Sequence, residues 1–229
     1  MKFKSPIISQ GSGSVAGLTM SHNRGGYYLR QRVIPTNPGS VPQAIVRAIV
    51  ASLTSAWANA LTVQQRTSWD TYAENVPLMG PLGEPRNVGG LAMFVRSNVP
   101  RLQSSLPAVL DGPTIYNLGD SLPPTIISLT AATDTFSISF DPLEDWANED
   151  DAGMIFYASR GQNQSINYFK GPYRYAGKVE GDAVTPPTSP AAIVDPFAIA
   201  VGQRGFLQTR VSRADGRLSN PFRTFDVGV

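Results

Sequence analysis

The 229-residue chain contains no cysteine and a single histidine, His22, and these two shortages exclude several classes of site. Without cysteine there can be no disulfide, no thiolate metal site and no cysteine nucleophile. One histidine cannot form a multi-histidine zinc site. A Ser-His-acid triad would have to use His22, which lies in a glycine-rich stretch with no scaffold signal. We therefore expect a non-enzymatic chain with no catalytic, metal-binding or cofactor-binding residues.

Long apolar runs are missing as well. No uninterrupted stretch approaches the roughly 18–20 apolar residues that span a bilayer. The first residues carry Lys2 and Lys4 but not the run of about 7–15 apolar residues that a signal peptide needs. The sequence thus predicts no membrane partner. Its 41% hydrophobic content is still ordinary for a globular protein with a buried core.

Charge divides the chain into two halves. Residues 1–101 carry ten Lys or Arg against three Asp or Glu, a net charge of +7, whereas residues 102–229 carry nine against fourteen, a net charge of −5. Such asymmetry indicates two modules with different neighbours. Fifteen of the nineteen basic residues are arginine, which suits both protein interfaces and phosphate contacts, so charge alone does not choose between a protein partner and nucleic acid.

Residues 1–39 resemble an extended arm. Glycines interrupt the segment, and Pro35 and Pro38 stiffen its end. Two short runs, 17–20 and 27–34, could pair as a hairpin across the turn between them. Nothing in this arm offers a core of its own. We therefore expect it to lie against another surface.

Residues 40–101 are predicted to be a helical domain. Ile45, Ile49, Leu53 and Trp57 recur at every fourth position and form one apolar stripe. Thr62 followed by Gln65 is a capping box that opens a second helix, which Pro77 ends. The expected core of the helix pair includes the aromatic side chains of the second helix, and its full membership is Ile45, Ile49, Leu53, Trp57, Trp69 and Tyr72. A third short helix is expected to end before Pro100.

Residues 102–124 contain four prolines and two glycines and are predicted to be a linker. Beyond them the periodicity changes to two: Phe136, Ile138 and Phe140 alternate with serines, as in a half-buried strand. Further strands are expected at 125–130, 153–159, 166–170, 173–179, 192–200, 205–213 and 221–227. Seven or so short strands over residues 125–229 predict a β-sandwich.

Two polar segments could bind a ligand or carry a reaction, but neither matches a known site pattern. The glycines of GSGSVAG fail the dinucleotide-binding spacing, and neither a strand nor a phosphate-loop lysine accompanies them. The acidic run from Asp141 to Asp151 is rich in calcium-type ligands, but it lacks the EF-hand pattern. Its carboxylates also share one loop instead of facing each other across a sugar cleft. A solvated loop is the preferred interpretation of the acidic run, and calcium binding stays open.

The arm interleaves arginine and tyrosine, which is the best nucleic-acid signal in the chain. The predicted interface residues are Arg24, Tyr27, Tyr28, Arg30 and Arg32. The chain shows no basic helix face of a dedicated nucleic-acid binder. We therefore prefer an arm that pairs with a protein neighbour, its arginines meeting carboxylates.

Two resemblances extend this interpretation. The stretch from Gly11 to about Arg101, notably SHNRGGYYLRQRVIPTNP and LTVQQRTSWDTYA, resembles an N-terminal region that recurs in virion proteins of tailed bacteriophages. The segment FLQTRVSRADGRLSNPF resembles the final hairpin of fibronectin type III and related immunoglobulin-like sandwiches. The resemblances imply a virion role and supply no catalytic residues.

The sequence therefore predicts an α+β chain with an arm, a helical domain, a linker and an immunoglobulin-like or fibronectin III-like β-sandwich. The function predicted from the resemblances is a phage virion structural protein, a head decoration or minor capsid component, assembled in the host cytoplasm. Its expected partners are the major capsid or other virion proteins and further copies of itself. Two alternatives stay open: a nucleic-acid-binding protein that uses the basic N-terminal module, and a tail protein that binds a receptor or carbohydrate.

Overall fold

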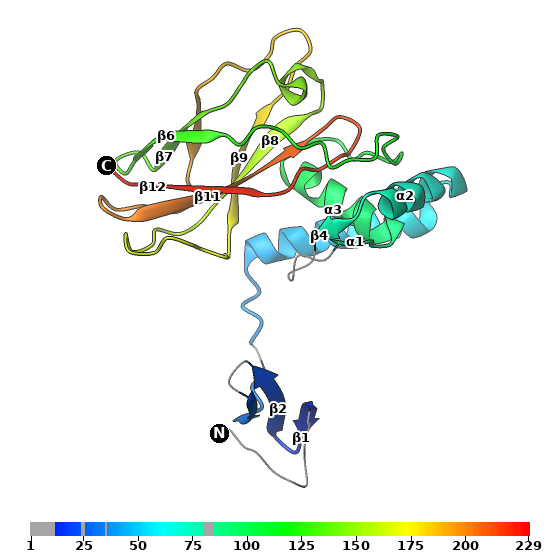
Figure 1. Cartoon of the computed structure of the whole chain (residues 1–229), viewed down its shortest axis with the longest axis vertical. Helices are drawn as coiled ribbons and strands as arrows, with labels where there is room; N and C mark the ends of the chain where they lie inside the picture. Colours follow the sequence, from blue (N-terminus) through cyan, green and yellow to red (C-terminus); the bar gives the residue numbers. More distant parts are fainter. Residues whose placement is uncertain (1–11, 24–25, 35, 80–84) are drawn as a thin grey trace. The chain divides into compact units, whose positions relative to one another are not determined.

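The computed structural model describes residues 12–23, 26–34, 36–79 and 85–229. The chain divides into two compact units, Met1–Val41 and Pro42–Val229 (Figure 1). Three helices and several antiparallel sheets make up the described part, so the expected α+β class is confirmed.

The first unit contains a three-stranded antiparallel sheet of β1 (Gly13–Val15), β2 (Leu18–Asn23) and β3 (Gly26–Gln31), in that order. The turn between β1 and β2 has positive φ at Ala16 (44°) and Gly17 (83°), values typical of a two-residue hairpin turn. The expected hairpin of β2 and β3 is present, with His22 paired to Tyr27. No described side chain from 12 to 41 is buried. The sheet therefore has no core of its own.

The second unit opens with three helices, α1 (Val41–Asn59), α2 (Val63–Asn75) and α3 (Gly90–Gln103). The predicted capping box of α2 is confirmed: Gln65 N–H donates to the Thr62 hydroxyl at 3.2 Å, and Thr62 N–H donates to the Gln65 side chain at 3.0 Å. A short ribbon of β4 (Leu78–Met79) and β5 (Pro85–Arg86) stands between α2 and α3. α2 and α3 pack on one another around Trp69 and Phe94.

The end of α3 differs from the prediction, because the helix continues through Pro100 to Gln103. A proline inside a helix removes one backbone donor. Here Ser104 closes the extra turn: its N–H donates to the carbonyls of Pro100 and Arg101, both at 3.0 Å, and its hydroxyl donates to the same two carbonyls at 2.9 Å. These contacts explain why the helix does not end at the proline.

Two antiparallel sheets follow the helices. The three-stranded sheet has the order β10-β7-β6, and the four-stranded sheet has the order β12-β11-β8-β9. Their bounds are β6 (Thr125–Thr130), β7 (Thr135–Ser139), β8 (Gly153–Ala158), β9 (Arg174–Glu180), β10 (Ala191–Val194), β11 (Arg204–Ser212) and β12 (Phe222–Val227). A short 3-10 helix, η1 (Asp145–Asn148), precedes β8.

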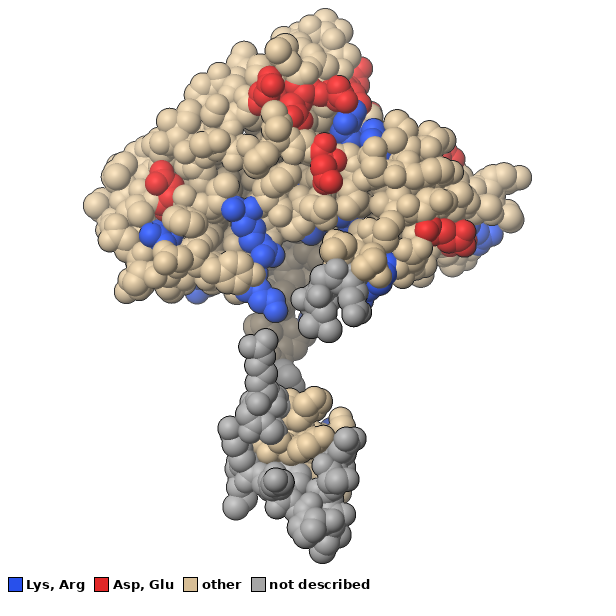
Figure 2. All heavy atoms as spheres, viewed as in Figure 1, with Lys and Arg blue, Asp and Glu red and all other residues tan. Residues whose placement is uncertain are grey.

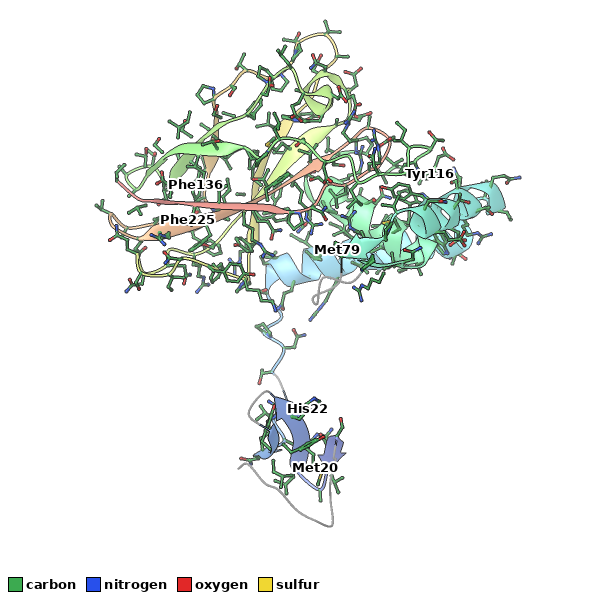
Figure 3. The ribbon with its side chains drawn as sticks, in the orientation of Figure 1. Met20, His22, Met79, Tyr116, Phe136 and Phe225 are labelled. Carbon is green, nitrogen blue, oxygen red and sulfur yellow. The ribbon has the colours of Figure 1, made fainter. Side chains whose placement is uncertain are left out.

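Side chains from both sheets form one buried cluster. Phe136 from β7, Phe156 from β8 and Leu207 from β11 are all at most 1% exposed, and Figure 3 labels Phe136 among these strands. The alternation predicted at 136–140 is confirmed, since Phe136 and Ile138 are buried and the serines between them are only half-buried. Burial on one face of each sheet fixes the register of the strands.

Two strand predictions differ from the structure. Residues 166–170 form no strand, because Phe169 packs against the rings of Tyr173 and Phe206, at 5.5 and 5.7 Å, instead of extending along a sheet edge. The strand expected at 192–200 ends at Val194. Asp195 then leaves the sheet and accepts a hydrogen bond from Phe197 N–H at 2.8 Å. Pro196 between them has no N–H to continue a ladder.

The predicted division of residues 42–229 also differs from the structure, which has one compact unit there. The segment 102–124, expected as a linker, supplies carbonyl acceptors to the helices. Trp69 donates through Nε1 to Leu110 O at 2.9 Å, and the Tyr72 hydroxyl donates to Asn117 O at 2.7 Å. Buried polar groups require such partners. The prolines of this segment therefore shape a packed connection between the helices and the sheets.

Candidate functional site

The predicted arm residues lie on β3 or directly beside it, except Arg24, which lies outside the described residues. Alternation along a strand places Tyr28 and Arg30 on one face of the sheet and Tyr27 on the other. Arg32 continues the chain after β3, and its N–H donates to Gly17 O at 2.7 Å. The arginine and tyrosine side chains predicted to form one interface are therefore divided between two faces.

The second face of this sheet is mainly apolar. The pairs Leu18–Gln31, Met20–Leu29 and His22–Tyr27 lie along it, and Figure 3 labels Met20 and His22 on β2. The rings of His22 and Tyr27 are 5.7 Å apart. Leu18 is 47% exposed and Val15, its partner on β1, is 66% exposed. One small sheet thus presents a basic face and an open apolar face.

Helix α1 is the second open apolar surface. Its only ionisable side chain is Arg47, and Val41 and Ile45 in its first half are 72% and 51% exposed. One side of its second half packs on the other helices: Leu53 is 3% exposed, and Trp57 lies 5.6 Å from the ring of Phe94. By length and composition alone, α1 could cross a membrane. Polar residues interrupt its apolar sequence, so it contains no long uninterrupted apolar run.

The predicted helical core is assembled as a cluster around Trp69 and Tyr72, both 0% exposed. Leu53 is buried in it, and Ile49 and Trp57 pack against it half-buried. Burial raises the pKa of Tyr72 to about 12. Ile45 differs from the prediction, because α1 packs on the helical cluster only from Ile49 onward. The Trp69 indole and the Tyr72 hydroxyl donate to the backbone carbonyls of Leu110 and Asn117. We therefore interpret this cluster as structural and not as a ligand cage.

Arg101 is the feature that the sequence analysis missed most clearly. It is 0% exposed and forms no ion pair with a carboxylate of the described residues; burial lowers its pKa. Its guanidinium donates to the carbonyls of Pro107 (2.7 Å), Arg213 (2.8 Å) and Asp151 (3.0 Å) and to the Ser212 hydroxyl (3.0 Å). One side chain thus ties α3 to the connecting segment, to β11 and to the loop before β8.

Arg96, one turn earlier on α3, has a related position. Its Nη2 donates to Leu218 O at 3.0 Å, while its Nη1 has no partner in the part of the chain that the structure describes. Burial, together with the neighbouring Arg210, lowers its pKa to about 10. Helix periodicity could have shown that Arg101, seven residues after Phe94, lies on the same buried face of α3 as that ring. Most acceptors of these two arginines are backbone carbonyls, which leave no mark in the sequence.

The acidic run lies on the loop around η1, where Figure 2 shows acidic side chains at the top of the view with basic ones directly beside them. Arg213 donates to both carboxylate oxygens of Glu149 and reaches Asp145 at 3.3 Å. Burial alone would raise the pKa of Glu149, but hydrogen bonds from Arg213 and from Ala214 N–H lower it. Within the described ranges, no three acidic or histidine side chains are arranged to hold a metal ion.

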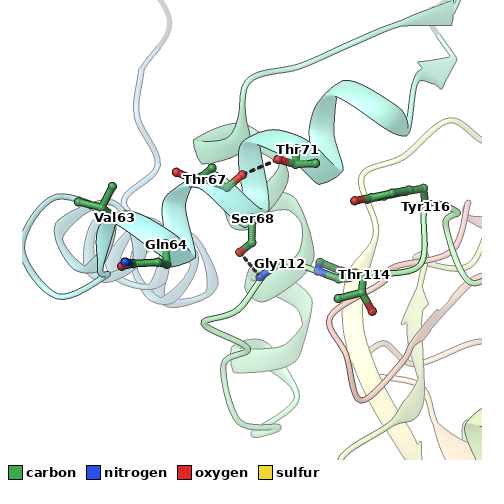
Figure 4. A pocket seen from close by; sticks show the side chains of 9 residues that line it. Val63, Gln64, Thr67, Ser68, Thr71, Gly112, Thr114 and Tyr116 are labelled. Carbon is green, nitrogen blue, oxygen red and sulfur yellow. Dashed lines mark hydrogen bonds between the residues drawn. The ribbon is translucent and has the colours of Figure 1, made fainter.

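One groove of about 400 Å³ lies between α2 and residues 112–116 (Figure 4). Gly112 N–H donates to the Ser68 hydroxyl at 2.8 Å and fixes its wall, and Tyr116 borders the other end. None of the nine lining residues is Asp, Glu, His, Lys, Arg or Cys. The groove offers hydroxyl and amide groups for binding but no strong acid–base pair.

Comparison of this chain with protein-family models, with curated proteins and with solved structures finds no match in any of the three.

Proposed function

We propose that this chain is a non-catalytic assembly protein, a structural component of a bacteriophage virion that decorates the head or forms a minor part of the capsid. The observation that carries this proposal is that two separate surfaces are apolar and open. None of the described side chains of the N-terminal sheet is buried, and on α1 Val41 and Ile45 are more than half exposed. Extended exposed apolar surfaces mark sites of interaction with a partner.

The virion assignment itself rests on the resemblance of residues 11–101 to N-terminal regions of tailed-phage proteins. A protein of this kind attaches through its basic N-terminal module to the major capsid or other virion proteins, beside further copies of itself. The β-sheets of residues 125–229 then project outward. A net charge of +7 in residues 1–101 suits a partner surface that carries carboxylates.

The strand order supports a fibronectin III-like sandwich for residues 125–229. Counted along this region, the first, second and fifth strands form one sheet, and the fourth, third, sixth and seventh form the other. An immunoglobulin constant domain has the fourth strand beside the fifth. Here β9, the fourth strand, pairs with β8 at the edge of the larger sheet, as the fibronectin III-like arrangement requires. Because a fold alone does not determine a function, the spacer or binding role that we assign to this domain is part of the proposal.

A protein partner suits α1 better than a bilayer does. The second half of the helix packs on the helical core through Leu53 and Trp57. Spanning a membrane would need roughly 20 apolar residues free of such contacts. The open apolar side chains Val41 and Ile45 in the first half of α1 are the ones we assign to the protein contact.

Nucleic-acid binding is the second candidate, favoured by one face of the N-terminal sheet. Tyr28 and Arg30 share that face, and the Arg30 and Arg32 side chains are exposed. Arginine beside an aromatic ring can hold a single strand. Elution from a heparin column separates this candidate, because binding to phosphates weakens steeply with salt.

The direct test is incorporation. Particles that lack this protein are mixed with the full chain or with residues 41–229, and binding is measured by co-sedimentation. We expect the full chain to bind and the truncated chain to remain in the supernatant, with circular dichroism showing that its fold is intact. Equal binding of a folded 41–229 would contradict attachment through the N-terminal unit.

A further inference from the structure

The two ends of the four-stranded sheet differ in charge. β8 runs from Gly153, which pairs with Glu180, to Ala158, which pairs with Arg174. The loop with η1 precedes β8, so the acidic run lies at the Gly153 end. Arg160 follows β8 and lies at the Ala158 end together with Arg174. The six residues of β8 separate these ends by about 17 Å, at roughly 3.4 Å per residue, so the two surfaces are distinct.

At the Ala158 end, two arginines share one aromatic ring. The guanidinium carbon of Arg160 lies 5.4 Å from the ring centroid of Phe197, and that of Arg174 lies 4.8 Å from it. Both side chains are exposed, and in the described part of the chain neither has a hydrogen bond or a carboxylate partner. A cation over a ring face is attracted by the ring quadrupole, but two like charges beside one ring still repel. An anionic group placed between them would remove that repulsion.

The Gly153 end offers such groups. The Asp145 side chain is 80% exposed and keeps only a 3.3 Å contact to Arg213, whose main partner is Glu149. The segment after β9 is tied to the same loop, because Ala183 N–H donates to Asp150 at 2.9 Å. Asp141, Asp150 and Asp151 of the same run are exposed and form no ion pair with Arg213, so further carboxylates face solvent here.

Each end also carries exposed apolar side chains. Leu143 and Val184 at the acidic end are 85% and 89% exposed. At the arginine end Val201 is 76% exposed. It lies on a turn in which Ala200 N–H donates to the Gln203 side chain. This turn is next to the bridge between Gln162 and Arg204. Arginine, aromatic and aliphatic side chains together are typical of protein interfaces.

We infer that the arginine end of one copy, centred on Arg160, Arg174 and Phe197, binds the acidic end of a second copy, centred on Asp145. The contact is head-to-tail, because the complementary surfaces lie at opposite ends of one sheet. Such heterologous contacts repeat from copy to copy and close into a ring or continue as a row. The inference concerns the second unit alone and does not depend on attachment to a virion.

The test compares the full chain with two charge-reversal variants by sedimentation equilibrium, from about 10 μM to about 1 mM protein, a range suited to weak association. Wild type is expected to associate at low salt and to dissociate as salt rises from about 0.05 to about 0.5 M. Arg174→Glu and Asp145→Lys should each weaken association on the order of tenfold or more. The matched controls Arg86→Glu and Asp111→Lys change the same charges on exposed residues elsewhere and should associate as wild type does.

Mixing the two variants provides the decisive result. Arg174→Glu keeps its acidic end and Asp145→Lys keeps its arginine end, so an equimolar mixture should associate through the two intact ends although each variant alone does so poorly. A monomeric wild type at low salt, association unchanged by both variants, or a mixture that stays monomeric would each overturn the inference. Association through the N-terminal unit or α1 would survive Arg174→Glu, so it is not mistaken for this contact. Loss of the head-to-tail contact with particle binding intact would leave the proposed function standing.

Discussion

The N-terminal unit and the body at residues 42–229 differ in how many of their side chains are buried. From 12 to 41 no described side chain is buried, although the sheet there has regular register and an apolar face. The body buries Trp69, Phe136 and Arg101 completely and satisfies the last with four hydrogen bonds. A small sheet without a core is marginally stable in water. The comparison indicates that the body folds on its own contacts, whereas the described side chains of the N-terminal unit bury nothing among themselves; a partner for that unit is our proposal.

Trp69→Ala should have the largest effect on the body. The indole is fully buried between Tyr72 and Phe94 and donates to Leu110 O. We expect the free energy of unfolding to fall by about 3–5 kcal/mol, as for other large aromatic truncations. Urea denaturation followed by circular dichroism measures it. A loss under about 1 kcal/mol would place the ring at a surface instead.

Arg101→Met should follow, with a loss of about 2–4 kcal/mol. Methionine fills most of the volume but leaves three carbonyls and the Ser212 hydroxyl without their donor, and an unsatisfied buried polar group costs about 1–3 kcal/mol. The control is Arg86→Met, an exposed position on β5. Equal stability of the two variants would show that the helices and the sheets are not joined through Arg101.

Asp195→Asn tests how the stability of the body depends on pH. Asp195 is 5% exposed, and burial raises its pKa to about 6, with the neighbouring Asp134 adding to the shift. The folded state therefore holds a proton that the unfolded state releases between about pH 4 and 6, so ionisation destabilises the fold as pH rises through this window. We expect the variant to be about 1–3 kcal/mol more stable than wild type at pH 7, a gain that vanishes near pH 4. A difference independent of pH would contradict this.

Ile45→Ser should have the smallest effect on folding. Its side chain is 51% exposed on the open half of α1, so the free energy of unfolding should change by no more than about 0.5 kcal/mol. Binding to particles should nevertheless weaken. Val63→Ser, at a 66% exposed position on α2, is the matched control and should alter neither quantity. Unchanged particle binding by Ile45→Ser would remove α1 from the proposed attachment surface.

Local signals made part of this fold predictable. The Thr62 capping box and the alternation at 136–140 are each determined by residues a few positions apart, and both are confirmed. The predicted core wrongly includes Ile45, because periodicity shows which face of a helix is apolar but not how much of that face another element covers. The Pro/Gly-rich segment 102–124 resembled a linker because composition does not reveal that its carbonyls accept from Trp69, Tyr72 and Asn98.

Hydrogen exchange of the backbone amides, in the free chain and on the assembled particle, tests the contrast between the two units most directly. In the free chain we expect β2 and β3 amides to exchange at rates near those of an unfolded chain, while β8 and β11 amides exchange only by global unfolding. Assembly should slow exchange in β2 and β3 by at least about tenfold and leave β8 and β11 nearly unchanged. Amides of β2 and β3 that are as protected as β11 in the free chain, or that are unaffected by assembly, would contradict the account.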